Sequence, residues 1–190
     1  MCSNRLEEGS AGVVGKEVSM IARLVTLYEA GGVRRMHTLP VREPQSVAAH
    51  TYGAMIIAAE LCRANRVGEG PVFRSLLYHD APEVATGDVP AHVKREAPGV
   101  REAYDRLEAQ FYDVWDIPRT VLGEKEALIA KSADTLELLF AMLHEKRTGN
   151  RHGRIYEVFN RALSYLREAE KELEGVSQLT RYLTKEWADA

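Results

Sequence analysis

The chain has 190 residues, enough for one domain that buries a hydrophobic core, and 45% of its residues are hydrophobic and 28% charged, as in soluble globular proteins. Its net charge of −3 lacks the basic excess of dedicated nucleic-acid binders, so no stable nucleic-acid partner is expected. No apolar run reaches membrane-spanning length, residues 1–15 lack a signal-peptide core, and two isolated cysteines indicate free thiols; we therefore expect a cytoplasmic protein without membrane contact.

The N-terminal part predicts a leader, one helix and a long loop. Residues 1–15 contain three glycines and are interpreted as a flexible leader before one domain spanning 16–190. From Val18 to Tyr28 apolar residues recur at helical spacing until Gly31-Gly32 ends the helix. Residues 33–45 contain two prolines and little periodicity, which predicts a loop. Loops of that length are often functional.

Helical patterns fill the rest of the chain. Ser46 is a suitable N-cap for a helix whose apolar stripe includes His50, and the next helix ends at His79-Asp80. A short helical piece around Glu83 precedes a turn. Helical spacing then returns over 93–115, with a pause at Pro98-Gly99, and over 118–148, 152–174 and 176–187. No run of alternating β-branched residues is long enough for a sheet. The sequence therefore predicts an all-α fold, a single helical bundle.

Four residues predict a metal site. His50 and Asp134 lie on inward helical stripes, and His79 and Asp80 lie at a helix end, where neighbouring side chains can turn toward one point. Each alone has a simpler explanation: a histidine bonded to a carbonyl, a helix C-terminus, or a carboxylate paired with Lys131 or an arginine. One divalent cation would satisfy all four together. Imidazoles and carboxylates suit Zn, Mn, Co, Fe or Ni, so the identity stays open.

Further residues predict acid–base chemistry and phosphate binding. Glu83 lies four residues after His79, so its carboxylate can take a proton from an attacking water, unless it is a solvated surface glutamate. Asp88 either caps the following turn or contacts substrate. The candidate phosphate ligands are Arg34, Arg35, Lys94 and Lys131. Of these, Arg34 is interpreted as an ordinary surface cation, and Lys131 lies one turn before Asp134 on the same inward face.

The order His50, His79-Asp80, Asp134 resembles that of the HD-domain metal-dependent phosphohydrolases. The segments SVAAH (46–50), LYHDAPEVATGDVPAHVK (77–94) and IAKSADTLELL (129–139) resemble the YfbR-like 5′-deoxynucleotidase branch, over about residues 20–150. The resemblance implies that these four residues hold the metal. It also implies that Glu83 is the catalytic carboxylate and Asp88 the second acidic residue of the pocket.

The resemblance also implies substrate contacts. Arg35 matches an arginine that reaches the substrate phosphate, and Lys94 and Lys131 fall where the family carries lysine. Met36 departs from the pattern, because a tryptophan often walls the sugar at this position. The stretch between Trp115 and Asp134 is also short, and no residue in it matches the additional glutamate of some members.

These observations predict hydrolysis of the 5′-phosphoester of 2′-deoxynucleotides, from a deoxynucleoside monophosphate to the nucleoside and phosphate. The alternative is a triphosphohydrolase, because the loop RRMHT (34–38) resembles phage-encoded relatives that remove triphosphate from dATP. A further alternative is a non-catalytic nucleotide-binding module. The least favoured interpretation is an interaction bundle whose polar core residues only specify packing. The expected cofactor is one divalent transition-metal ion, with a second ion, Mg²⁺, considered for a polyphosphate substrate. A homodimer or higher homo-oligomer is expected.

Overall fold

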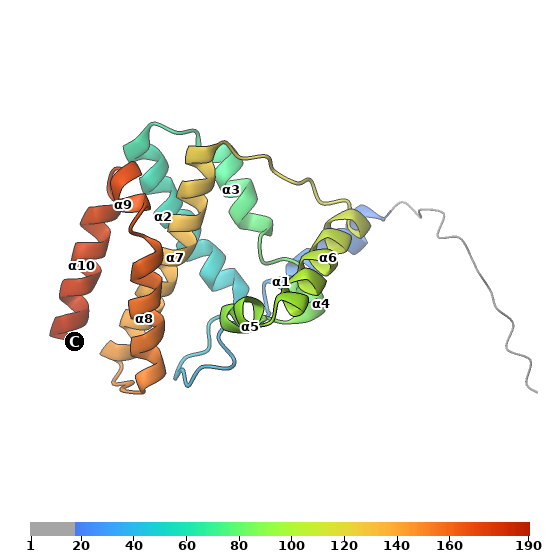
Figure 1. The fold of residues 1–190 in the computed structure, drawn as a ribbon. Helices are drawn as coiled ribbons and strands as arrows, with labels where there is room; N and C mark the ends of the chain where they lie inside the picture. Colours follow the sequence, from blue (N-terminus) through green and yellow to red (C-terminus); the bar gives the residue numbers. More distant parts are fainter. Residues whose placement is uncertain (1–17) are drawn as a thin grey trace, which may run out of the picture.

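A computed structural model describes residues 18–190, and this part of the chain is built from α-helices joined by loops (Figure 1). Between Met20 and Asp189 it contains no β-strand, only a single bridge between Arg34 and Ser46. The prediction of one all-α domain is confirmed. The expected leader, residues 1–15, lies outside the described residues. The helices are α1 (Met20–Ala30), α2 (Val47–Asn65), α3 (Glu69–Tyr78), α4 (Glu83–Thr86), α5 (Ala91–Glu96), α6 (Pro98–Val114), α7 (Glu124–Arg147), α8 (Gly153–Tyr165), α9 (Ala169–Glu172) and α10 (Val176–Asp189).

Six helices form the larger part of the domain, which we call the main bundle: α2, α3 and α7 to α10. Helix α7 is its centre, because α2, α3, α8 and α10 all pack against it (Figure 1). Burial of this apolar interior is the dominant stabilising contribution. Its largest fully buried apolar side chains include Leu61, Leu76, Leu136, Leu139, Met142, Phe159 and Leu183.

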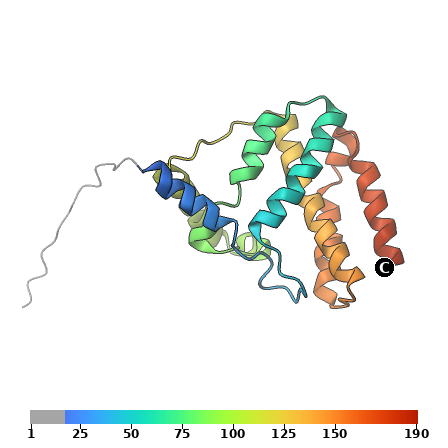
Figure 2. The same ribbon diagram turned by 180° about the vertical axis from the view of Figure 1, so that it is seen from behind.

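The remaining helices, α1, α4, α5 and α6, form a smaller unit that we call the side layer. It has its own small core, made by Ala30, Ala81, Phe111 and Ile117. Seen from behind, α1 lies across this layer and leads into the loop 33–45 before α2 (Figure 2). The chain passes from bundle to side layer through the turn 79–82, which joins α3 to α4. That turn contains His79 and Asp80.

Local signals explain where the helices next to this turn begin and end. The Ser46 hydroxyl accepts the N–H of Ala49, so the predicted N-cap of α2 is confirmed. Helix α1 ends at Gly31, as predicted. Helix α4 ends after one turn at Gly87, whose φ of +70° lies in the left-handed region that favours glycine. This turn directs the chain toward Asp88 and α5.

Two predicted helix ranges were wrong. Helix α7 begins at Glu124 rather than Pro118, because the Glu126 carboxylate accepts the N–H of Gly123 and starts the helix there. Residues 115–123 instead connect the side layer with the bundle (Figure 1). The range 152–174 is divided into α8 and α9, since the chain turns to bury Leu166, Ala169 and other apolar residues against the bundle. In residues 18–190, none of these helices combines the length and apolarity needed to cross a membrane.

Candidate metal centre

Three helices of the main bundle bring the predicted ligands together. His50 lies on α2, His79 follows the last residue of α3, and Asp134 lies on α7. Nε2 of His50 is 2.9 Å from Oδ1 of Asp134 and 3.4 Å from Nε2 of His79. The His79 Nε2 to Asp134 Oδ1 distance is 3.9 Å. These three side chains could hold a metal ion, since one ligand atom from each lies within 4.8 Å of the others.

The fourth predicted ligand, Asp80, lies in the same cluster. Its Oδ2 is 3.2 Å from Nε2 of His79 and 3.6 Å from Nε2 of His50. Nitrogen and oxygen ligands bind zinc at about 2.0–2.2 Å, so atoms of a tetrahedral set lie roughly 3.3 Å apart. The five measured separations scatter around that value. His50, His79 and Asp134 therefore fit one divalent ion, whereas Asp80 is engaged by Arg35 and falls outside the group whose ligand atoms all lie within 4.8 Å of one another.

Both histidines direct Nε2 toward the cluster because Nδ1 has another partner. Nδ1 of His79 lies 2.6 Å from the carbonyl oxygen of Leu76, and Nδ1 of His50 lies 2.5 Å from Oε2 of Glu137. A carbonyl oxygen and an ionised carboxylate only accept hydrogen bonds, so Nδ1 carries the proton in each ring. Nε2 is then the nitrogen that can bind a cation once it has given up its own proton.

The charges in the cluster compensate one another in the ion-free protein. Burial alone would raise the pKa of Asp134, but hydrogen bonds with His50 and His79 outweigh it and lower that pKa. Burial alone would lower the pKa of His79, yet hydrogen bonds with Asp134 and Asp80 raise it to about 10. In the ion-free protein, protons on the histidine rings therefore supply the positive charge between the carboxylates. A divalent ion can take over that role, releasing protons as it binds.

Glu83 lies beside the cluster, at the start of α4. It is buried, with 5% of its surface exposed, which contradicts the solvated-surface alternative. Burial, followed by the nearby charges of Asp80 and Asp88, raises its pKa to about 7. Among residues 18–190, its buried Oε2 has no hydrogen-bond partner. A carboxylate with a free oxygen and a near-neutral pKa suits a general base.

The loop 33–45 reaches the cluster through Arg35 and Met36. The Arg35 guanidinium donates to Oδ2 of Asp80, while its buried Nε finds no acceptor in the described part of the chain. The next residue, Met36, has a left-handed backbone with φ of +57°, unusual outside glycine, and its N–H donates to Oδ2 of Asp88 at 2.6 Å. Asp88 therefore accepts a hydrogen bond from the loop 33–45. Arg34 is exposed, as expected for a surface cation.

The two predicted lysines lie in different surroundings. Lys94 on α5 is half-buried, with Nζ 3.5 Å from the centre of the Tyr104 ring, and its charge also acts on Glu83. Lys131 is exposed, so the expectation that it faces inward was wrong. Asp134 is bonded to the histidines instead of Lys131. Within 18–190 Lys131 forms no ion pair, one turn before Asp134 on α7.

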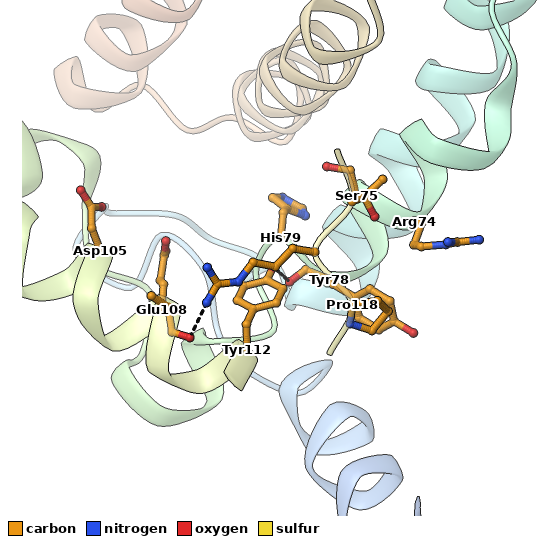
Figure 3. A pocket seen from close by; sticks show the side chains of 11 residues that line it. Arg74, Ser75, Tyr78, His79, Asp105, Glu108, Tyr112 and Pro118 are labelled. Atoms are coloured by element: carbon orange, nitrogen blue, oxygen red, sulfur yellow. Dashed lines mark hydrogen bonds between the residues drawn. The ribbon is translucent and has the colours of Figure 1, made fainter. Parts of the chain in front are cut away.

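A cavity of about 330 Å³ adjoins His79. Figure 3 shows Tyr78, His79 and Tyr112 close together, with Asp105 and Glu108 of α6 on one side and Arg74 and Ser75 of α3 on the other. The cavity is of the size that small-molecule sites occupy. Of the predicted site residues, only His79 lines this cavity.

The sequence analysis did not identify two supporting carboxylates, Glu137 and Glu145. Glu137 bonds to His50, and buried Glu145 accepts the N–H groups of Arg42 and Glu43, which ties the loop 33–45 to α7. A signal for Glu137 was present, because it lies three residues after Asp134 and so on the same helical face. The partner of Glu145 is a distant backbone, which residue spacing does not reveal.

The fold and the donor set define the class. The structure resembles the cyanophage S-2L HD phosphohydrolase DatZ, described as bound to dA and one catalytic Zn²⁺ ion, with a TM-score of 0.66 and 16% identity over 87% of this chain and 94% of that one. The family model of the YfbR-like 5′-deoxynucleotidases matches residues 19–185. The chain belongs to this family of HD-domain phosphohydrolases.

Two relatives are similar to this chain over three quarters of its length or more. The mouse (Mus musculus) 5′-deoxynucleotidase HDDC2 is 25% identical over 164 residues, covering 80% of this chain and 79% of the relative. The dATP triphosphohydrolase of Salmonella phage PMBT28 is 28% identical over 152 residues, covering 75% of this chain and 77% of the relative. The names of these relatives include both activities that the sequence had suggested.

Proposed function

We propose that this protein is a metal-dependent hydrolase of the 5′-phosphoester of 2′-deoxynucleotides, releasing the deoxynucleoside and phosphate from a monophosphate. The observation that carries the proposal is the convergence of His50, His79, Asp80 and Asp134, with the unpartnered oxygen of Glu83 beside them. Family membership supports the reaction class. A non-catalytic module would have no use for a buried carboxylate with a raised pKa next to a complete ligand set.

The four ligands would hold one divalent transition-metal ion: Zn, Mn, Co, Fe or Ni. Such an ion would polarise a phosphoryl oxygen and make a water more acidic. Glu83 would take the proton of the attacking water onto its free Oε2. Its pKa of about 7 leaves a useful share of the base ionised near neutral pH.

Arg35 and Lys94 would offset charge on the phosphate. Nε of Arg35 is a buried donor without an acceptor in the described residues, and the guanidinium is already held by Asp80. Lys94, on α5, would add a second positive charge that acts near Glu83. Asp88 would orient the sugar while holding the N–H of Met36, so that Met36 forms the wall near the sugar.

The second candidate is a dNTP triphosphohydrolase, in which water attacks the same α-phosphorus and triphosphate leaves. Lys131 favours this candidate, because it is an exposed cation one turn from Asp134 on α7. It forms no ion pair within the described residues. The match to the phage dATP triphosphohydrolase agrees with it. A second ion, Mg²⁺, would accompany the polyphosphate.

The assembly that we propose is a homodimer or larger homo-oligomer. Its support is the exposed apolar face of α1, which is unfavourable in water unless covered. The apolar side chains on this face are Met20, Ile21, Leu24, Val25 and Tyr28. Light scattering after size exclusion measures the mass, and a monomer at micromolar concentration would contradict the proposal.

The experiment that tests the proposed function incubates the metal-loaded protein with dAMP, dATP, AMP and ATP and identifies the products. Phosphate from dAMP, with slower reaction of AMP, is the expected result. Triphosphate from dATP would select the second candidate. Absence of product from all four nucleotides with each of the five metals would overturn both.

A further inference from the structure

Glu137 holds His50 from the side opposite the ligand cluster. It lies on α7, one turn after Asp134, and only 6% of its surface is exposed. Its Oε2 is 2.5 Å from Nδ1 of His50, whereas Asp134 faces Nε2 of the same ring. One helix therefore contacts both nitrogens of one imidazole.

The surroundings of Glu137 fix its carboxylate. Oε1 accepts a hydrogen bond of 2.5 Å from the Gln45 side-chain amide, so both oxygens have partners. Gly53 on α2 leaves room for it, because a Cβ at that position would lie 2.9 Å from Cγ of Glu137. The carboxylate can hardly rotate away from His50 without losing two hydrogen bonds in a buried environment.

We infer that Glu137 is a positioning residue for the metal: it keeps the proton of His50 on Nδ1 and aims Nε2 at the ion. The inference rests on the proposed metal centre. His79 obtains the same orientation from the carbonyl oxygen of Leu76, which is fixed by its helix. For His50 the acceptor is a side chain that carries charge, so it also increases the basicity of Nε2.

Gln45 extends this support to the substrate loop. Its side chain donates to Glu137, and its carbonyl oxygen accepts the N–H of Arg35 at 2.8 Å. The residue that stabilises the acceptor of His50 is thus bonded to the residue that pairs with Asp80. Loss of the Gln45 side-chain amide should therefore weaken metal binding, while the backbone hydrogen bond to Arg35 is kept.

The test measures binding of Mn²⁺ and Zn²⁺ alone to chelator-stripped protein by calorimetry, without substrate. Glu137→Ala should weaken binding by about 10- to 100-fold, the usual effect of removing the partner of a ligating histidine. Glu137→Gln keeps an acceptor of the same shape without charge and should recover part of the affinity. Gln45→Ala should give a smaller loss than Glu137→Ala.

Glu145→Gln is the matched control, because Glu145 is an equally buried carboxylate on the same helix but contacts the loop backbone rather than a ligand. It should lower thermal stability while leaving metal affinity unchanged. In the zinc-loaded protein, the ¹H–¹⁵N spectrum should show the Nδ1 proton of His50 strongly downfield, and Glu137→Gln should move it upfield.

The outcomes separate this inference from the proposed function. Wild-type protein that binds neither ion would overturn the metal centre and the inference together. Wild-type protein that binds one ion, with unchanged affinity in a folded Glu137→Ala, would overturn the inference alone. If Glu137→Ala does not fold, an unchanged affinity and an unchanged His50 resonance in Glu137→Gln would overturn it.

Discussion

The main bundle and the side layer contribute to the site in different ways. The bundle supplies His50, His79 and Asp134 from long or well-packed helices, and each histidine has a fixed partner behind it. The side layer and its loop supply Glu83, Asp88 and Lys94 from one-turn helices and connections. The bundle groups are therefore held by their partners. The side layer and its loop leave one oxygen of Glu83 and Nε of Arg35 without a hydrogen-bond partner in the described residues, and these are groups that we propose meet the substrate.

Removal of a bundle ligand should have the largest effect. His50→Ala takes away a buried donor at the centre of the cluster, so bound metal and phosphohydrolase activity should both fall to background. Metal analysis and a dAMP assay measure the two. His144→Gln, an exposed histidine on α7 paired with Glu43, should change neither. Full activity of His50→Ala without metal would show that the bundle does not hold the catalytic ion.

Glu83 belongs to the side layer, and its loss should affect turnover without affecting the ion. Glu83→Gln should lower kcat by roughly 10²- to 10⁴-fold, the range for a general base, while metal affinity and KM change little. Steady-state kinetics with calorimetry separates these quantities. Turnover at the wild-type rate would assign proton transfer to another group.

Asp88 should act mainly on substrate binding. Asp88→Ala removes the acceptor of the Met36 N–H, a hydrogen bond to a charged group worth about 1.5–3 kcal/mol, so KM should rise by roughly 10-fold or more. Asp88→Asn keeps an acceptor oxygen, so its KM should lie between those of the wild type and of Asp88→Ala. Metal affinity should stay constant in both variants. A change in metal affinity as large as that in KM would remove the distinction between the two regions.

Lys131 distinguishes the two substrate classes. Lys131→Ala should raise KM for dATP several-fold and leave KM for dAMP almost unchanged, because an exposed cation acts weakly and over a short range. Lys185→Ala, an exposed lysine on α10, is the control. Equal effects on both substrates would indicate that Lys131 serves the α-phosphate.

Asp134 of the bundle and Glu83 of the side layer should shift the stability of the ion-free protein with pH in opposite directions. Asp134 has a lowered pKa, so its contribution to the stability of the fold is present above the unfolded pKa and is lost as pH falls toward the folded pKa. Glu83 has a raised pKa of about 7. Ionisation of this buried carboxyl therefore lowers the stability of the fold as pH rises from its unfolded pKa toward 7. Glu83→Gln should therefore raise Tm in chelator at pH 8, by about 2–4 °C for each kcal/mol, and hardly at pH 5. Equal shifts at both pH values would contradict the raised pKa.

The bundle part of the site could be predicted from the sequence, because helical periodicity alone places His50 on an inward stripe. The side layer could be predicted less well. Lys131 was placed inward since its spacing matches Asp134, but the face they share opens to solvent between the two regions. The pairing of Arg35 with Asp80, and of Asp88 with Met36, joins residues about 50 positions apart. Such contacts depend on how the loop packs, which periodicity does not encode.

The dependence of catalysis on one ion in the bundle cluster is tested most directly by titrating chelator-stripped protein with Mn²⁺ while dAMP hydrolysis is followed. We expect one ion per chain at His50, His79, Asp80 and Asp134, with activity rising in proportion to its occupancy. Hydrolysis at the full rate in chelator, with no ion found by metal analysis, would contradict this account.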